Sequence, residues 1–88
     1  MSSLLIEFIV SVTDNFFMDK LFLEKVAKRI KTLRTLKGMT QDDLACDADV
    51  SRSTIGMIET VKTDIKLSKI KKIATALEVE PYELLKFD

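Results

Sequence analysis

The chain has 88 residues, with 14 Lys+Arg, 14 Asp+Glu, one Cys, one Pro, two Gly and no His. A chain of this length hides only roughly 60–65% of its unfolded surface, so one domain is expected. Without His there are no Ser-His or Cys-His nucleophile pairs and no imidazole metal ligands. We therefore expect no enzyme activity, no metal and no other cofactor, and we interpret Cys46 as a small buried apolar residue.

The neutral total conceals a segmented charge. Residues 1–19 sum to −3, residues 20–37 to +6, residues 38–61 to −4, residues 62–72 to +4 and residues 73–88 to −3. The two basic segments can bind phosphates if the fold brings them to one side. Taken alone, the charge pattern favours two solvated helix faces.

The N-terminal segment, residues 1–18, is too apolar for a free tail. Its stretch from Leu4 to Val12 is much shorter than the roughly 20 residues that a bilayer requires, and no basic residue precedes it as in a signal peptide. Leu5, Phe8, Ile9, Val12 and Phe16 share one face at helical spacing. This pattern predicts an added helix that packs on the next helix or on a partner subunit.

Five short helices are expected in residues 19–88. The first runs from Leu21 to Leu36, with Asp19 as its cap and Gly38 after its end. The second begins at Thr40, with Asp43 in the acidic slot of a capping box, and ends near Asp47.

The third helix begins at Ser51 and buries Ile55 and Ile58. A fourth takes Ile70, Ile73, Ala74 and Leu77 as its core positions, and Pro81 opens a fifth that ends near Phe87. The expected fold is all-α and compact, with residues 40–60 as the reader unit and residues 67–88 as a dimerisation region.

Two short helices joined by a tight turn are typical of a helix-turn-helix DNA reader. Ser51, Arg52, Ser53 and Met57 lie on one side of the third helix, opposite its buried isoleucines. Arg52 can donate two parallel hydrogen bonds to a guanine, and Gln41 can direct its amide at a phosphate. The alternatives are an ordinary surface role for Arg52 and a core position for Met57.

Three stretches carry a family resemblance: Arg34-x-x-Lys37-Gly38-Met39-Thr40-Gln41-x-Asp43-Leu44-Ala45, then Val50-Ser51-Arg52-Ser53-Thr54-Ile55-x-x-Ile58-Glu59, and Ile70-x-x-Ile73-Ala74-x-Ala76-Leu77-x-Val79. Over about Val26 to Leu85 the chain resembles the Cro/C1-type (Xre) helix-turn-helix domain. Within it the pattern is most similar to the controller proteins of restriction-modification systems. Those controllers begin where Met18 lies, so residues 1–17 are alternatively an optional extension from an upstream start codon.

The resemblance implies roles for individual residues. Arg52, Ser53 and Met57 match base-reading positions, and Arg34 and Glu59 match a structural ion pair. Asp42 matches the place of an acidic spot for RNA polymerase, the alternative being capping and solvation. The expected DNA-backbone contacts are Gln41, Ser51, Thr54, Lys62, Thr63, Lys66 and Lys69.

Three residues depart from the family pattern. Val61 stands where Gly or Asn usually ends the third helix, so a left-handed stop there would strain a β-branched residue. Gly56 lies inside the reading helix, which indicates either close approach to DNA or simple tolerance. Lys66 is a poor cap for the fourth helix.

The predicted function is that of a cytoplasmic, sequence-specific transcriptional regulator that binds a near-palindromic operator as a homodimer. Apolar residues beyond the needs of one small core, namely Val79, Tyr82, Leu84, Leu85 and Phe87, are expected at the dimer interface. No membrane and no small-molecule ligand is expected. The alternatives are a repressor of the phage or mobile-element type and, from another class, a protein-binding adaptor that keeps the fold without reading DNA.

Overall fold

The computed structural model describes the backbone of residues 2–87 and the side-chain surroundings of residues 19–87, and within residues 2–87 all regular secondary structure is helical. Four α-helices, α1 (Ser2–Leu36), α2 (Gln41–Ala48), α3 (Arg52–Glu59) and α4 (Leu67–Ala76), are followed by a 3₁₀ helix, η1 (Pro81–Leu85). The all-α prediction is confirmed. The expected fifth α-helix is instead the single 3₁₀ segment η1, which Pro81 opens at its first turn.

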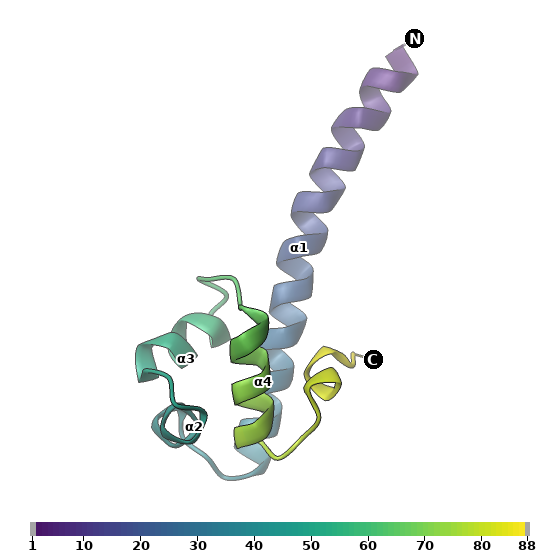
Figure 1. Ribbon diagram of the computed structural model, residues 1–88. Helices are drawn as coiled ribbons and strands as arrows, with labels where there is room; N and C mark the ends of the chain where they lie inside the picture. The colour runs from purple at the N-terminus through teal and green to yellow at the C-terminus, as the bar shows by residue number, and fades with distance from the viewer. Residues whose placement is uncertain (1, 88) are drawn as a thin grey trace.

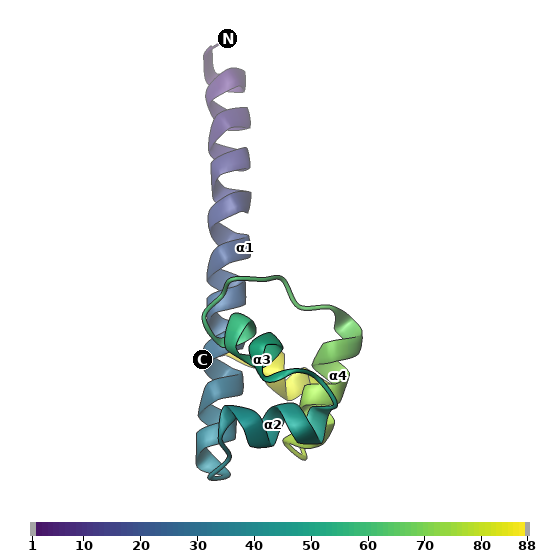
Figure 2. The same cartoon turned by 90° about the vertical axis from the view of Figure 1, so that its left-hand side faces the viewer.

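The outline of the molecule is set by α1. A helix of 35 residues is about 50 Å long at 1.5 Å per residue, and the molecule measures 55 × 25 × 20 Å. Figure 1 shows the first half of α1 rising clear of the other helices, and Figure 2 shows the same from the side. α1 runs unbroken through Asp19, so the prediction that Asp19 caps a separate helix is wrong. No Gly or Pro stands between residues 2 and 36 to stop the helix.

The second half of α1 is part of the helix-turn-helix body. Val26 and Ile30 of α1 are buried with Leu44 of α2, Ile55 of α3 and Ile73 of α4, each at 1% exposure or less. η1 covers the remaining side of α1, where Leu84 is fully buried. One apolar core therefore holds α2 and α3 at a fixed angle to α1 and α4.

The helices end in a common way, with one residue in the left-handed conformation followed by a hydrogen bond back across the last turn. The residues are Gly38, Asp49, Val61 and Glu78, with φ angles of 70°, 55°, 58° and 60°. After Val61, the Lys62 amide donates to the Met57 carbonyl at 2.8 Å. The predicted left-handed stop at Val61 is confirmed, and a β-branched residue there costs roughly 1–2 kcal/mol.

Candidate nucleic-acid interface

The two helices of the reader unit begin at side-chain caps. Thr40 Oγ1 accepts a hydrogen bond from the Asp43 amide at 3.0 Å, and the Thr40 amide donates to Asp43 Oδ2 at 2.9 Å, so the predicted capping box is present. The hydrogen bonds from the Thr40 amide and hydroxyl lower the pKa of the Asp43 carboxyl. Ser51 Oγ accepts from the Thr54 amide at 3.1 Å and so starts α3.

Arg34 and Glu59 join α1 to α3. Arg34 Nε lies 2.7 Å from Glu59 Oε2 and Nη2 lies 3.0 Å from Oε1, while Nη1 donates to the Met39 carbonyl at 2.8 Å. Arg34 is 8% exposed and the Glu59 side chain 2%. The hydrogen bond to Glu59 raises the pKa of Arg34, so the guanidinium is charged. This buried, bidentate ion pair fixes the position of α3 relative to α1.

Gln41 belongs to the same network. Its Nε2 donates to Glu59 Oε1 at 3.1 Å, so the carboxylate that receives Arg34 also orients the first residue of α2. Sequence reasoning placed Gln41 at a phosphate and did not foresee this bond. The second amide hydrogen and the backbone N–H groups at the start of α2 remain suited to a phosphate oxygen.

One side of α3 is free for contact. Ser51, Arg52, Ser53 and Met57 form this side, which we call the reading face, and all four are exposed; Met57 is exposed by 43%. On the opposite side Ile55 and Ile58 are 0% and 2% exposed. Met57 is therefore not a core residue of the subunit, although methionine in a helix usually is.

A shallow depression of about 140 Å³ lies beside the reading face. The residues around it come from α3, the following loop and α4: Thr54, Met57, Ile58, Thr63, Asp64, Lys66 and Lys69. Five of these were predicted to contact DNA. The fold thus brings two of the lysines of the basic segment 62–72 next to α3, whereas Lys62 is exposed on the loop and does not line the depression.

Arg52 has a partner that the sequence did not indicate. Its Nε lies 3.2 Å from Asp42 Oδ1, and the two side chains are 66% and 73% exposed. Asp42 lies in the first turn of α2 and Arg52 in the first turn of α3, ten residues later. The sequence does contain a signal for this ion pair. Two opposite charges lie in the first turns of two helices that a tight turn joins.

The predicted dimer residues separate into two groups. Tyr82 and Leu85 are 66% and 41% exposed and remain available for a partner. Leu84 is fully buried in its own subunit, so its assignment to an interface is wrong: η1 turns it into the core. Val79 and Phe87 pack in part against the same core, and the ring of Phe87 meets Phe22 edge-on at 5.7 Å between centroids.

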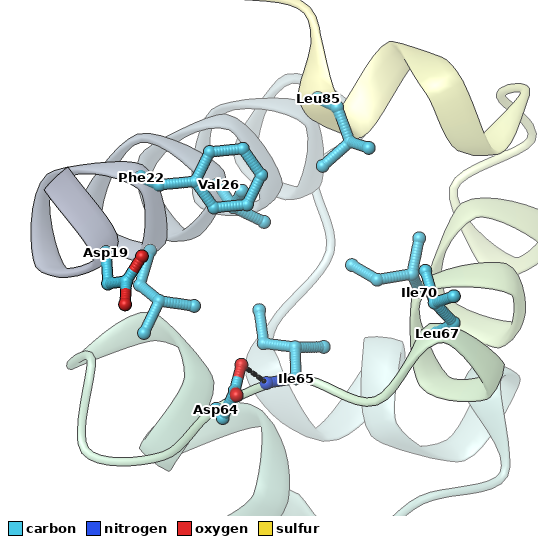
Figure 3. A pocket seen from close by; sticks show the side chains of 9 residues that line it. Asp19, Phe22, Val26, Asp64, Ile65, Leu67, Ile70 and Leu85 are labelled. Atoms are coloured by element: carbon cyan, nitrogen blue, oxygen red, sulfur yellow. Dashed lines mark hydrogen bonds between the residues drawn. The ribbon is translucent and has the colours of Figure 1, made fainter. Parts of the chain in front are cut away.

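An apolar groove of about 310 Å³ lies between α1 and α4, on the side of the loop that follows α3. Figure 3 shows Phe22 and Val26 on one wall, Leu67 and Ile70 on the other, Ile65 below and Leu85 above. Asp19 and Asp64 stand at the groove as its charged residues. Leu67, exposed by 81%, extends this apolar surface outward.

Among the residues that the structure describes, no group of three or more Cys, Asp or Glu side chains is arranged to hold a metal ion. No helix in the described range has the length and apolar character needed to cross a membrane.

Cys46 is exposed, so its prediction as a buried residue is wrong. The buried positions of α2 are Leu44, Ala45 and Ala48.

The capped helices α2 and α3 with their tight turn and exposed reading face define a helix-turn-helix protein. Residues 30–84 match the helix-turn-helix family, and the chain belongs to it.

Solved structures and a curated relative agree with this assignment. The restriction-modification controller protein C.AhdI from Aeromonas hydrophila is 42% identical, with a TM-score of 0.69 over 70% of this chain and 94% of that one. C.Esp1396I bound to a 25 base pair operator site is 36% identical, with a TM-score of 0.67 over 73% of this chain and 88% of that one.

A hypothetical transcription factor of Neisseria meningitidis is 35% identical over 60 residues, which are 68% of this chain. The match covers 57% of the length of the Neisseria protein.

Proposed function

We propose that this protein is a transcription regulator that binds a near-palindromic operator as a homodimer, and that it is the controller of a restriction-modification system. The observation that carries the proposal is the reading face on α3, held on the body by the Arg34–Glu59 ion pair. The similarity to C.AhdI and to operator-bound C.Esp1396I supports the same function. Such a regulator acts in the cytoplasm and needs no cofactor.

Arg52, Ser53 and Met57 are proposed to contact base edges. The major groove of B-DNA admits one α-helix, and α3 buries only the side opposite these residues. Arg52 is the residue suited to a guanine, because its guanidinium has two parallel donors for O6 and N7. Ser53 has a small hydroxyl and Met57 an apolar side chain, which suits contact with a thymine methyl group.

The DNA backbone is proposed to run along both ends of the reading face. Ser51 and Thr54 lie at the start of α3, and Gln41 lies at the start of α2, beside Glu59 of α3. Beyond the end of α3 come Lys62, Thr63, Lys66 and Lys69. Thr54, Thr63, Lys66 and Lys69 already share one depression. Phosphate contacts of this kind set the position of α3 but carry no sequence information.

The homodimer is proposed to form through the exposed part of η1, with Tyr82 and Leu85, beside Leu67 of α4. These side chains are 66%, 41% and 81% exposed, and Leu85 and Leu67 line the apolar groove. A two-fold interface here would present one α3 per subunit to major grooves about 34 Å apart. Tyr82→Asp tests this interface by sedimentation, since it adds a charge where a partner would bury it, and leaves Leu84 in the core.

RNA polymerase is proposed as a partner at Asp42. The Asp42 carboxylate is held by Arg52 in the free protein. When Arg52 turns to a base, Asp42 becomes available for a contact on the outer side of α2. The test is transcription in vitro from a promoter with the operator upstream, with Asp42→Asn compared with the parent.

The DNA-binding proposal is tested by titrating the full chain with genomic fragments at two salt concentrations. A regulator gives a retained fragment whose affinity falls steeply with salt, because phosphate contacts release counterions. A protein-binding adaptor on the same fold gives no salt-dependent specific complex. If the fragment lies upstream of adjacent endonuclease and methyltransferase genes, it supports the controller over a phage-type repressor.

A further inference from the structure

The first half of α1, residues 2–18, extends away from the helix-turn-helix body as a straight continuation of the helix (Figures 1 and 2). We call it the arm. At 1.5 Å per residue it is about 25 Å long. Most of the stability of protein helices comes from packing of an apolar face, so a partner that covers the apolar positions would stabilise the arm.

The apolar positions of the arm continue the pattern of the face that α1 buries in the body. Val26 and Ile30 are buried and Leu33 packs in part against the core. The same alternation of four-residue and three-residue steps runs back to the start of the helix, through Leu5, Ile9, Val12, Phe16, Asp19, Leu23, Val26, Ile30 and Leu33. This is the heptad spacing of helices that pair along a seam.

The arm cannot cover these positions with its own body. α1 is one uninterrupted helix, so the arm cannot fold back, and the expectation that it packs on the following helix is wrong. An anionic membrane surface is a poor partner, because the charged residues of the arm are Glu7 and Asp14 and it has no Lys or Arg. In the heptad register both acids fall at the position farthest from the seam.

We infer that the arm pairs with the arm of a second copy of this chain, in antiparallel orientation. The heptad positions are self-complementary when the two helices run in opposite directions, because Leu5 then lies opposite Phe16 and Ile9 opposite Val12. In the same register Asp19, the one charged heptad position, lies opposite the uncharged Ser2, so the two Asp19 carboxylates of the pair are far apart.

A parallel pair would place the two Asp19 carboxylates opposite each other at the seam, next to the apolar groove that Asp19 borders (Figure 3). Like charges at such a position are destabilising. The antiparallel pair instead sets the two bodies at opposite ends, about 50 Å apart along the helix axis. That separation exceeds the 34 Å or so between operator half-sites, so the arms join two DNA-binding units and do not form one.

The register is tested by disulfide cross-linking in the full chain with Cys46→Ser, since Cys46 is exposed. A chain with Leu5→Cys is mixed with a chain with Phe16→Cys under mild oxidation. The antiparallel register predicts a cross-linked product in the mixture and little with either chain alone, because the two copies of residue 5 lie about 16 Å apart along the axis. Cross-linking of each chain with itself, or none at all, overturns the inference.

A second measurement keeps the pairing testable without cysteines. Val12→Asp places a charge on a heptad position, and the matched control Ser11→Asp places it one residue earlier and off the seam. In sedimentation we expect Val12→Asp to halve the mass of the largest species and to weaken that association by at least about tenfold. Ser11→Asp should match the parent. Equal association of parent, Val12→Asp and Ser11→Asp overturns the inference, as does binding to anionic vesicles that Val12→Asp abolishes.

Pairing of the arms and DNA binding by the reading face can be tested independently. Val12→Asp lies outside the helix-turn-helix body, so it should leave the affinity of a single body for a DNA half-site within about twofold of the parent. If Val12→Asp loses self-association and retains DNA binding, the result supports pairing of the arms. Loss of DNA binding in Val12→Asp and Ser11→Asp alike, with association unchanged, overturns it.

Discussion

Arg52 Nε lies 3.2 Å from Asp42 Oδ1, so the arginine best placed to read a base is paired with a carboxylate of the preceding helix. Both side chains are about two-thirds or more exposed, and an ion pair of this kind is worth at most about 1 kcal/mol. Asp42 therefore holds Arg52 loosely over the start of α3. In the proposed complex, DNA competes with Asp42 for the same guanidinium.

Asp42→Asn should raise the affinity for DNA by about two- to fivefold, because it frees Arg52 and removes a negative charge beside the phosphates. Fluorescence anisotropy with labelled DNA measures the change. Asp47→Asn, which removes an exposed charge from the same helix, is the control and should have the smaller effect. If Asp42→Asn gives the same gain in a chain with Arg52→Ala, the effect does not pass through Arg52.

Glu59→Ala should lower the free energy of unfolding by about 3–5 kcal/mol, because it leaves Arg34 charged and buried without its partner. Urea denaturation followed by circular dichroism measures this. Lys37→Ala is the control, since it breaks the ion pair of Lys37 with Glu78, whose side chain is 79% exposed. That change should cost at most about 1 kcal/mol. Similar losses for the two variants would contradict a structural role for the Arg34–Glu59 pair.

The two glycines should respond to alanine in opposite directions. At Gly56 an added Cβ meets only Gln41 Oε1, at 3.8 Å, so Gly56→Ala should stabilise the fold by about 0.5–1 kcal/mol. At Gly38 nothing lies within 4 Å, but φ is +70°, so Gly38→Ala should destabilise it by about 1 kcal/mol. Thermal unfolding of both variants measures the two changes in stability. A loss of stability in Gly56→Ala would show that α3 requires its glycine for the fold.

The capping box at the start of α2 gives the fold a pH dependence. The hydrogen bonds from Thr40 lower the pKa of Asp43 in the folded chain, so the cap stabilises the fold above the ordinary Asp range near pH 4. This stability is lost as pH falls through the lower folded pKa. Urea midpoints measured from about pH 6 to pH 2 should converge between the parent and Asp43→Asn at the acid end. Parallel curves across the range would contradict the assignment.

The reader unit was predictable because its signals are local. Thr40 with Asp43 marks one helix start and Ser51 the next, and the spacing of Ile55 and Ile58 sets which side of α3 is buried. These features depend on neighbours three or four residues away, which the sequence displays directly.

Three other features depend on how whole helices extend and pack, and the sequence did not reveal them. Asp19 has the residue type of a cap, yet the helix formers on both sides continue α1 through it. The sequence predicts Leu84 at an interface because the end of the chain has more apolar residues than one small core needs. In the structure η1 folds back on α1, where the Arg29 guanidinium donates a hydrogen bond to the Glu83 carbonyl at 3.0 Å. Cys46 was expected inside, but Leu44, Ala45 and Ala48 already fill the buried side of α2.

The most direct test of the account is the comparison of Arg52→Ala with Lys66→Ala on operator and random DNA, with the operator first selected by the parent protein. Arg52→Ala should reduce the preference for operator by about 1–3 kcal/mol and leave affinity for random DNA nearly unchanged. Lys66→Ala should weaken binding to both sequences alike and reduce the salt slope by about one. If Arg52→Ala weakens operator and random DNA equally, α3 does not read bases through Arg52, and the central claim is contradicted.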